Sequence, residues 1–183
     1  YWMHRAYHGY GVIWPLHAVH HSAQVLTPFS AYRQHPLATA LSVIVISVFA
    51  GIVQGAIIAG LQPDMSLAQL AGINAFFVIA VLAMGNFHHS HIWISFGPVI
   101  ERVLISPAQH QIHHSTLPRH HNKNFGQSLA LWDWLFGTLY LIRNHEELVL
   151  GLDHPDDAPL MTQRIGPILW HPVQQLMLSL GLK

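Results

Sequence analysis

The sequence lacks cysteine and is poor in charged residues. With no cysteine among 183 residues, a disulfide-stabilised scaffold and a CxxCH haem attachment are both excluded. Asp, Glu, Lys and Arg make up 9% of the chain and hydrophobic residues 51%, whereas charged residues make up about 25% of typical soluble domains. The eight basic residues balance the eight acidic ones and form no tract, which excludes a nucleic-acid-binding protein. This composition predicts a membrane protein.

Two long uncharged stretches carry much of the hydrophobicity. Residues 37–61 have no charge over 25 positions, and a helix that rises 1.5 Å per residue over this length crosses a hydrocarbon core of ~30 Å. Residues 67–87 are also uncharged, and residues 62–66 between them contain Pro63 as a helix breaker. Ser66 and Gln69 form a possible capping box at the start of the second stretch. The sequence therefore predicts a transmembrane helical hairpin.

A hairpin returns the chain to the side from which it left, so all the histidines lie on one face of the membrane. Every Lys and Arg also lies on that side, while the turn holds only Asp64. The positive-inside rule makes this face cytoplasmic, in a bacterial inner membrane or the endoplasmic reticulum. Residues 88–183 predict a water-facing helical cap, with an interfacial helix over residues 165–182. A GxxxG motif at Gly51 and Gly55 predicts a helix contact within the molecule rather than a dimer.

Histidine is unusually frequent, since 17 histidines outnumber the 16 charged side chains. They form an HxxxH pair and two HxxHH triplets, in which spacings of three and four place side chains on one helical face. Imidazole is the commonest neutral metal ligand, and three to five such nitrogens enclose one ion. Eight nitrogens in three motifs therefore predict two ions. The motifs are His4 and His8; His17, His20 and His21; and His110, His113 and His114.

The alternative is that these histidines are incidental or hydrogen-bonded, which is the commoner case for a single HxxxH. Three motifs together reverse this expectation, because each unsatisfied buried imidazole costs about 1–3 kcal/mol. Pro15 and the segment Ser106, Pro107 and Gln109 predict helices that begin shortly before each triplet. We expect the helix dipole there to lower the histidine pKa values and keep the rings neutral.

The motifs resemble the three histidine boxes of the fatty acid hydroxylase/sterol desaturase superfamily of membrane di-iron enzymes. The boxes are YWMHRAYH (1–8), HAVHHS (17–22) and HQIHHS (110–115). RQHP (33–36), NKNFG (122–126) and LWDWLFGT (131–138) also resemble segments of this superfamily, so the similarity spans residues 1 to about 140. The resemblance implies an all-α membrane fold, in which two irons activate dioxygen for attack on a lipid C–H bond.

Two further ligand positions follow from the resemblance and fall on His89 and His121. Neighbouring histidines leave His88 or His91, and His120, as alternatives. The superfamily also carries transmembrane helices before its first box, so we expect residues 1–183 to be a single domain that is truncated at its N-terminus. The complete set of expected metal ligands is His4, His8, His17, His20, His21, His89, His110, His113, His114 and His121.

Other residues receive supporting roles. Asp133 accepts the free N–H of a ligand histidine or caps a turn, and His35 is expected beside the ligands. Trp93, Phe96 and Trp132 are expected to line the approach of the lipid. Glu101, Arg102 and Arg119 hold the cap together or meet lipid headgroups. His145, His154 and His171 lie outside any ligand spacing and are expected to be ordinary surface or interfacial residues.

The sequence thus predicts a membrane di-iron monooxygenase that hydroxylates or desaturates a fatty acyl, sterol or related lipid. No dinucleotide fingerprint occurs, so electrons come from a separate donor of the cytochrome b5, ferredoxin or reductase type. One alternative is a zinc-dependent membrane hydrolase, because a catalytic zinc needs only three ligands. Another is a metal carrier, for which the spans offer only Gln54 and Asn74. The oligomeric state is left open.

Overall fold

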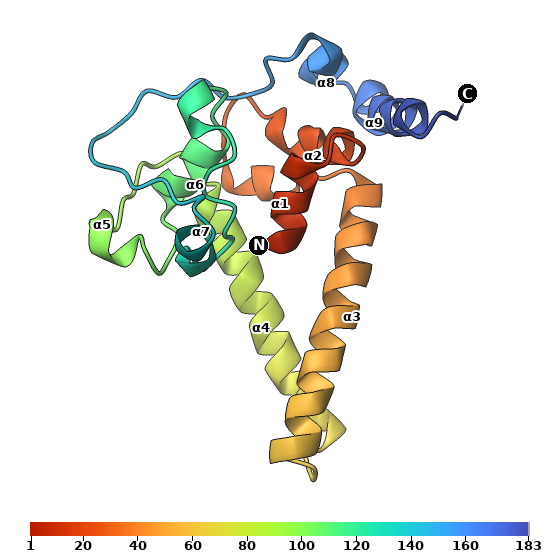
Figure 1. The fold of residues 1–183 in the computed structure, drawn as a ribbon, viewed down its shortest axis with the longest axis vertical. Helices are drawn as coiled ribbons and strands as arrows, with labels where there is room; N and C mark the ends of the chain where they lie inside the picture. Colours follow the sequence, from red (N-terminus) through yellow and green to blue (C-terminus); the bar gives the residue numbers. More distant parts are fainter. Residues whose placement is uncertain (183) are drawn as a thin grey trace.

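The computed structural model describes residues 1–182, and its regular elements are helices. Within these residues the only strand-like pairings are two isolated bridges, Leu104 with Leu129 and Ser115 with Leu150. The all-α prediction is confirmed. Two long helices form one part of the molecule, and short helices and loops form a cap at one end of them (Figure 1).

The long helices are α3 (Pro36–Leu61) and α4 (Leu67–His88), within one residue of the predicted spans. Their most apolar windows have mean hydropathies of 2.4 and 2.1, and both helices are long enough to cross a membrane. Their apolar side chains are largely exposed, including Phe49 in α3 and Phe76 in α4. Apolar surface of this extent needs a lipid environment or a partner to cover it. The direction of crossing stays a prediction.

The turn between α3 and α4 has the predicted capping box. Ser66 Oγ accepts from the Gln69 N–H at 3.3 Å, and Gln69 Oε1 accepts from the Ser66 N–H at 2.9 Å. Near this turn the Gln54 amide donates to Asn74 Oδ1 at 3.0 Å, and beyond it the helices diverge toward the cap (Figure 1). A Cβ added at Gly51 or Gly55 would meet no atom within 4 Å. The predicted internal GxxxG contact is therefore wrong, because the helices separate.

The cap consists of residues 1–35 and 89–182. Its elements are α1 (Trp2–Gly9), α2 (Trp14–His21), η1 (Pro28–Tyr32), α5 (Gly97–Ile100), α6 (Pro107–His113), η2 (Pro118–His120), α7 (Leu131–Leu135), η3 (Pro155–Asp157), α8 (Ala158–Met161) and α9 (Ile165–Ser179). Its apolar cores are small, and one of them joins Ala18 and Val19 of α2 to Leu160 of α8. Short helices of this kind are not stable alone, so contacts between them hold the cap together.

Helix α9 confirms the predicted C-terminal helix and packs against α2. Its location at a membrane interface stays a prediction. His35 ties it to the hairpin: Nδ1 accepts from the Leu37 N–H at 3.2 Å, and Nε2–H donates to the Leu169 carbonyl at 3.0 Å. His35 thus caps α3 and holds α9. The expectation that it supports the metal ligands is wrong, because both ring nitrogens are used here.

Polar contacts of Glu101, which is buried, and of Arg119, which is exposed, join parts of the cap, in agreement with one of the two roles expected for them. Glu101 is fully buried, and its Oε1 accepts from Ser95 Oγ at 2.7 Å and from Ser106 Oγ at 2.8 Å. Arg119 pairs with Glu146 at 2.9 Å. These contacts fix the loops on either side of α6.

Candidate metal centre

Separate parts of the chain bring nine histidines together. Two of them lie in α1, three in α2 and two in α6. The other two are C-cap residues: His89 follows α4 and His114 follows α6. Pro15 stands at the start of α2, and α6 begins with the predicted capping box, in which Ser106 Oγ accepts from the Gln109 N–H at 3.2 Å. The start signals in the sequence therefore place both triplets on helices.

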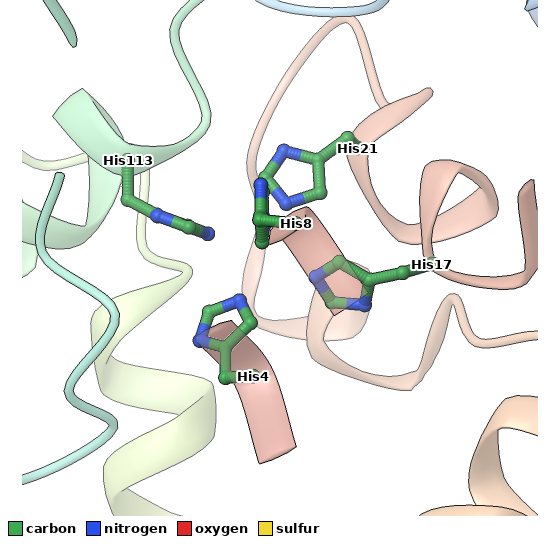
Figure 2. Close-up of side chains that lie close together, drawn as sticks. All are labelled: His4, His8, His17, His21 and His113. Carbon is green, nitrogen blue, oxygen red and sulfur yellow. The ribbon is translucent and has the colours of Figure 1, made fainter. Parts of the chain in front are cut away.

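The first cluster is the five-histidine group. One nitrogen from each ring lies within 4.8 Å of the others, and the rings point toward one another (Figure 2). The Nε2 atom of every member is buried and has no hydrogen-bond partner. The members are His4, His8, His17, His21 and His113.

Backbone carbonyls fix the tautomer of two members of this group. His4 Nδ1–H donates to the Phe125 carbonyl at 2.8 Å, and His113 Nδ1–H donates to the Lys123 carbonyl at 2.8 Å. With the proton on Nδ1, each Nε2 lone pair faces the centre of the group. Unpaired buried acceptors cost about 1–3 kcal/mol each, and a cation among them removes this penalty. The donor set therefore fits a metal ion.

The second cluster is the four-histidine group, formed by His20, His89, His110 and His114. The Nε2 atom of His89 lies 3.0 Å from those of His20 and His110, and the Nε2 atoms of His110 and His114 are 3.1 Å apart. Nitrogens bound at ~2.1 Å and at right angles to one another around one ion are separated by about 3 Å. His89 Nδ1–H donates to the Gly85 carbonyl at 2.7 Å, which leaves its Nε2 free to bind metal.

Each HxxHH triplet contributes to both groups. In the first triplet His17 and His21, four residues apart, join the five-histidine group, and His20 joins the four-histidine group. The second triplet reverses this arrangement, because His110 and His114 join the four-histidine group. The groups are in direct contact, since the rings of His21 and His114 stack with centroids 4.4 Å apart. Two metal sites would therefore lie side by side.

Nine of the ten expected ligands lie in these groups. The tenth, His121, is exposed, and its Nε2–H donates to the Thr116 carbonyl at 2.9 Å. Its role as a ligand stays a prediction.

The alternative histidines and those expected as background lie outside both groups. His88 Nε2–H donates to the Ile105 carbonyl at 3.0 Å, His91 is exposed, and His120 contacts Glu146 at 3.1 Å. Of the three neighbours near residue 89, only His89 joins a group. His145 packs against Trp93, and His154 caps η3. His145, His154 and His171 are all outside the two histidine groups.

Asp133 supports the centre through a loop rather than through an imidazole. Its Oδ1 accepts from the Phe125 N–H at 2.7 Å and from Thr138 Oγ1 at 2.6 Å, and its Oδ2 accepts from the Gly126 N–H at 2.7 Å. Two roles were expected for Asp133, contact with a ligand histidine or capping of a turn, and these hydrogen bonds to backbone N–H groups support capping of a turn. The turn in question positions the Phe125 carbonyl, which binds His4.

Asn124 is a supporting residue that sequence reasoning missed. Its side chain donates to the Gln109 carbonyl at 3.1 Å and accepts from the Tyr140 N–H at 2.7 Å. Its φ of 55° is a left-handed conformation that Asn tolerates better than most residues. It stands between Lys123 and Phe125, whose carbonyls fix His113 and His4. The NKNFG motif gave the only available signal.

The histidine pKa values are lowered, but not for the expected reason. His20 and His21 lie in the last turn of α2, and His113 lies in the last turn of α6. A helix dipole favours the charged imidazolium at these ends. Burial is the largest cause, and it lowers the pKa of His113 from 6.5 to about 4 against the opposing hydrogen bond to the Lys123 carbonyl. The rings are therefore neutral and able to bind metal near pH 7.

A cavity of about 330 Å³ connects the two long helices to the histidines. At one end it is lined by apolar residues of α3 and α4, including Ile46 and Leu82. At the other end it reaches members of both groups: His4, His17, His20, His89 and His110. The aromatic residues that line it are Tyr1, Tyr7, Tyr32 and Phe125. The expectation for Trp93, Phe96 and Trp132 is wrong, because these rings pack elsewhere in the cap.

Comparison with known proteins agrees with this arrangement. The sequence model of the family described as Fatty acid hydroxylase matches residues 1–138. The chain belongs to the fatty acid hydroxylase family. The matched region includes all nine clustered histidines and the loop that carries Phe125 and Asp133.

Several curated relatives of this fatty acid hydroxylase family member are known. Alkylglycerol monooxygenase of Danio rerio is 28% identical to this chain, and the alignment covers 85% of this chain and 30% of the relative. Alkylglycerol monooxygenase of Homo sapiens is 27% identical, and the alignment covers 85% of this chain and 31% of the relative. Ornithine lipid hydroxylase OlsE of Rhizobium tropici is 28% identical over 76% of this chain and 38% of the relative. The chain thus spans about a third of the length of these relatives. No solved structure matches.

The loop that supports His4 gives a first prediction. A Cβ at Gly126 would lie 2.3 Å from the Leu129 carbonyl oxygen and 2.8 Å from Asp133 Oδ2. Gly126→Ala should therefore displace the Phe125 carbonyl and lower both the melting temperature and the metal content. Gly9→Ala is the control, because a Cβ at Gly9 meets nothing within 4 Å. Thermal unfolding and elemental analysis measure both effects, and equal behaviour of the two variants would contradict the role of this loop.

Acid should destabilise the metal-free fold. The pKa of buried His113 is about 4, below its ordinary value of 6.5, so between these pH values the unfolded chain binds more protons than the folded chain. Stability should accordingly be highest above pH 6.5 and should fall as pH decreases toward 4. Melting temperatures of chelator-treated protein at a series of pH values measure this loss. His154→Ala should retain the same profile, whereas a flat profile for the unaltered protein would refute buried neutral histidines.

Proposed function

We propose that this chain forms the catalytic core of a membrane di-iron enzyme that uses dioxygen to hydroxylate a lipid. The observation that carries the proposal is the position of two histidine groups at the inner end of a cavity whose outer end lies between two apolar helices. The names of the relatives, which act on lipids as monooxygenase or hydroxylase, support the same chemistry.

The donor set favours iron with dioxygen over other metal chemistry. Both groups consist of neutral imidazoles and contain no carboxylate among the described residues, so two bound cations would keep most of their charge. Sites of this kind attract anionic oxygen species. When bound, two irons supply the activation of dioxygen that oxidation of a C–H bond needs. The chain supplies the geometry, because backbone carbonyls hold His4, His89 and His113 with Nε2 toward the centre.

The cavity fits a lipid that carries both an apolar chain and a hydrogen-bond donor. Its apolar end would accept a hydrocarbon chain from the bilayer. Asn86 lines the same cavity, where its Nδ2 donates to Tyr32 Oη at 3.0 Å and its Oδ1 is buried without a partner. A hydroxyl or amide N–H of the substrate would satisfy this oxygen and place the neighbouring chain against the histidines. We propose this positioning role for Asn86.

The membrane arrangement and electron supply are part of the same proposal. The cap holds seven of the eight basic residues within the described part of the chain, and the hairpin turn holds Asp64, which favours a cytoplasmic cap. A separate protein of the cytochrome b5, ferredoxin or reductase type would deliver electrons there. The metal-carrier alternative is weakened because Gln54 and Asn74 bond to each other instead of lining a path. A zinc hydrolase would need one three-histidine site rather than two larger groups.

Metal content and ligand variants test the central claim. The purified protein should hold two irons per chain and yield hydroxylated lipid that carries label from isotopic dioxygen. His20→Ala removes a member of the four-histidine group and His113→Ala one of the five-histidine group, so each should lower the iron content and abolish turnover. His154→Ala should change neither property. One zinc per chain, or product formed without oxygen, would reject the proposal.

Filling the cavity tests the route of the lipid. Val43 lines the apolar part of the cavity, and Val43→Trp should fill that space and raise KM for the lipid while leaving two irons bound. Asn86→Leu should lower kcat/KM for lipids with a free hydroxyl more than for their O-methylated analogues. Asn86→Gln should partly restore this preference. Identical losses for both lipids in Asn86→Leu would contradict the positioning role.

A further inference from the structure

A second, polar pocket reaches the histidines from another direction. It has a volume of about 170 Å³ and is lined by His8, His21, His113 and His114. The cavity between the long helices is lined by the other five clustered histidines, and no residue lines both spaces. The two histidine groups therefore form a wall with a lipid-sized cavity on one face and a small polar pocket on the other.

The mouth of the pocket is formed by exposed polar residues of two loops. His121 and Asn122 come from the segment after α6, and Asp153 comes from the segment before η3. The other lining residues include Thr116, whose carbonyl accepts from His121 Nε2–H at 2.9 Å. His121 is thus an imidazole beside the five-histidine group that belongs to neither group.

The two spaces differ in what they admit. A hydrated divalent cation loses its water only where other oxygen or nitrogen ligands replace that water. At the outer end of the larger cavity the lining residues of α3 and α4 are mostly apolar, and their polar members Thr39, Ser42 and Asn86 include no carboxylate or imidazole to replace that water. The carboxylate of Asp153, the imidazole of His121 and the amide of Asn122 offer them at the mouth of the pocket.

We propose that this polar pocket is the entrance through which a hydrated divalent cation reaches the histidine groups, and that Asp153 and His121 bind the ion in transit. The inference rests on the proposed metal centre and adds a route to it. Metal and lipid then arrive from opposite faces of the histidine wall. Metal exchange therefore does not require an empty lipid cavity.

The absence of cysteine allows the pocket to be plugged reversibly. Asp153→Cys, purified in lipid nanodiscs and stripped of metal by a chelator, is labelled with a bulky methanethiosulfonate reagent. Cobalt(II) is added, and its uptake is followed by visible absorbance. The label should slow uptake about tenfold, which corresponds to about 1.4 kcal/mol of added barrier. A reducing agent that removes the label should restore the rate.

Matched variants separate the pocket from the larger cavity. Asp156→Cys is exposed three residues further along and lines neither space, so the same label there should leave uptake unchanged. Val43→Trp, which fills the lipid cavity, should also leave uptake unchanged. His121→Ala should slow uptake while the final content stays at two cobalt ions per chain. This result would give His121 a transient role in place of the permanent one that the family resemblance implies.

The outcomes distinguish the entrance from the metal centre. If labelled Asp153→Cys binds two cobalt ions at an unchanged rate, the proposed entrance is wrong, while the proposed metal centre stands. Slower uptake in Val43→Trp than in labelled Asp153→Cys would also overturn it and assign entry to the lipid side. Failure of the unlabelled, unaltered protein to bind cobalt would overturn the proposed metal centre itself, and the entrance with it.

Discussion

The constraint on which the structure depends is the burial of neutral imidazole nitrogens that face one another. In the five-histidine group, hydrogen bonds from Nδ1 of His4 and His113 to carbonyls direct the lone pairs of Nε2 inward. Five inward nitrogens without partners would cost several kcal/mol at about 1–3 kcal/mol each. A positive charge at the centre turns this repulsion into attraction. Binding of a metal ion, as we propose, would therefore be coupled to folding of the cap.

The proposed coupling would explain how so small a cap holds its shape. Helices α1, α2 and α6 have seven or eight residues each, and their apolar clusters each contain only three buried residues. Packing of this extent stabilises short helices weakly. Two ions that bind side chains from all three helices would act as cross-links where a larger protein has a hydrophobic core. The carbonyls of Lys123 and Phe125 extend the cross-linked region to the loop held by Asp133.

Features encoded by local spacing could be predicted from the sequence, and features set by packing between distant segments could not. The apolar lengths gave α3 and α4, the three histidine motifs gave eight of the nine clustered histidines, and the family resemblance gave His89. The dipole argument assumed helices that extend beyond the triplets, whereas α2 ends at His21 itself. The position of His35 against Leu169 depends on how α9 folds back over 134 residues, which no local pattern encodes. The carbonyls that fix His4 and His113 are backbone groups, and the NKNFG segment that contains them does not by itself indicate this role.

The HxxHH spacing itself determines that the two sites are joined. The two adjacent histidines of a triplet point about 100° apart around a helix of 3.6 residues per turn, and the first histidine lies between them in direction, nearer to the second of the two. One triplet therefore places His17 and His21 in the five-histidine group and His20 in the four-histidine group, and the second triplet does the reverse. Neither site can form without both helices, so loss of either triplet disrupts both sites. The same arrangement makes the histidines a continuous wall, with the polar pocket on one face and the larger cavity between α3 and α4 on the other.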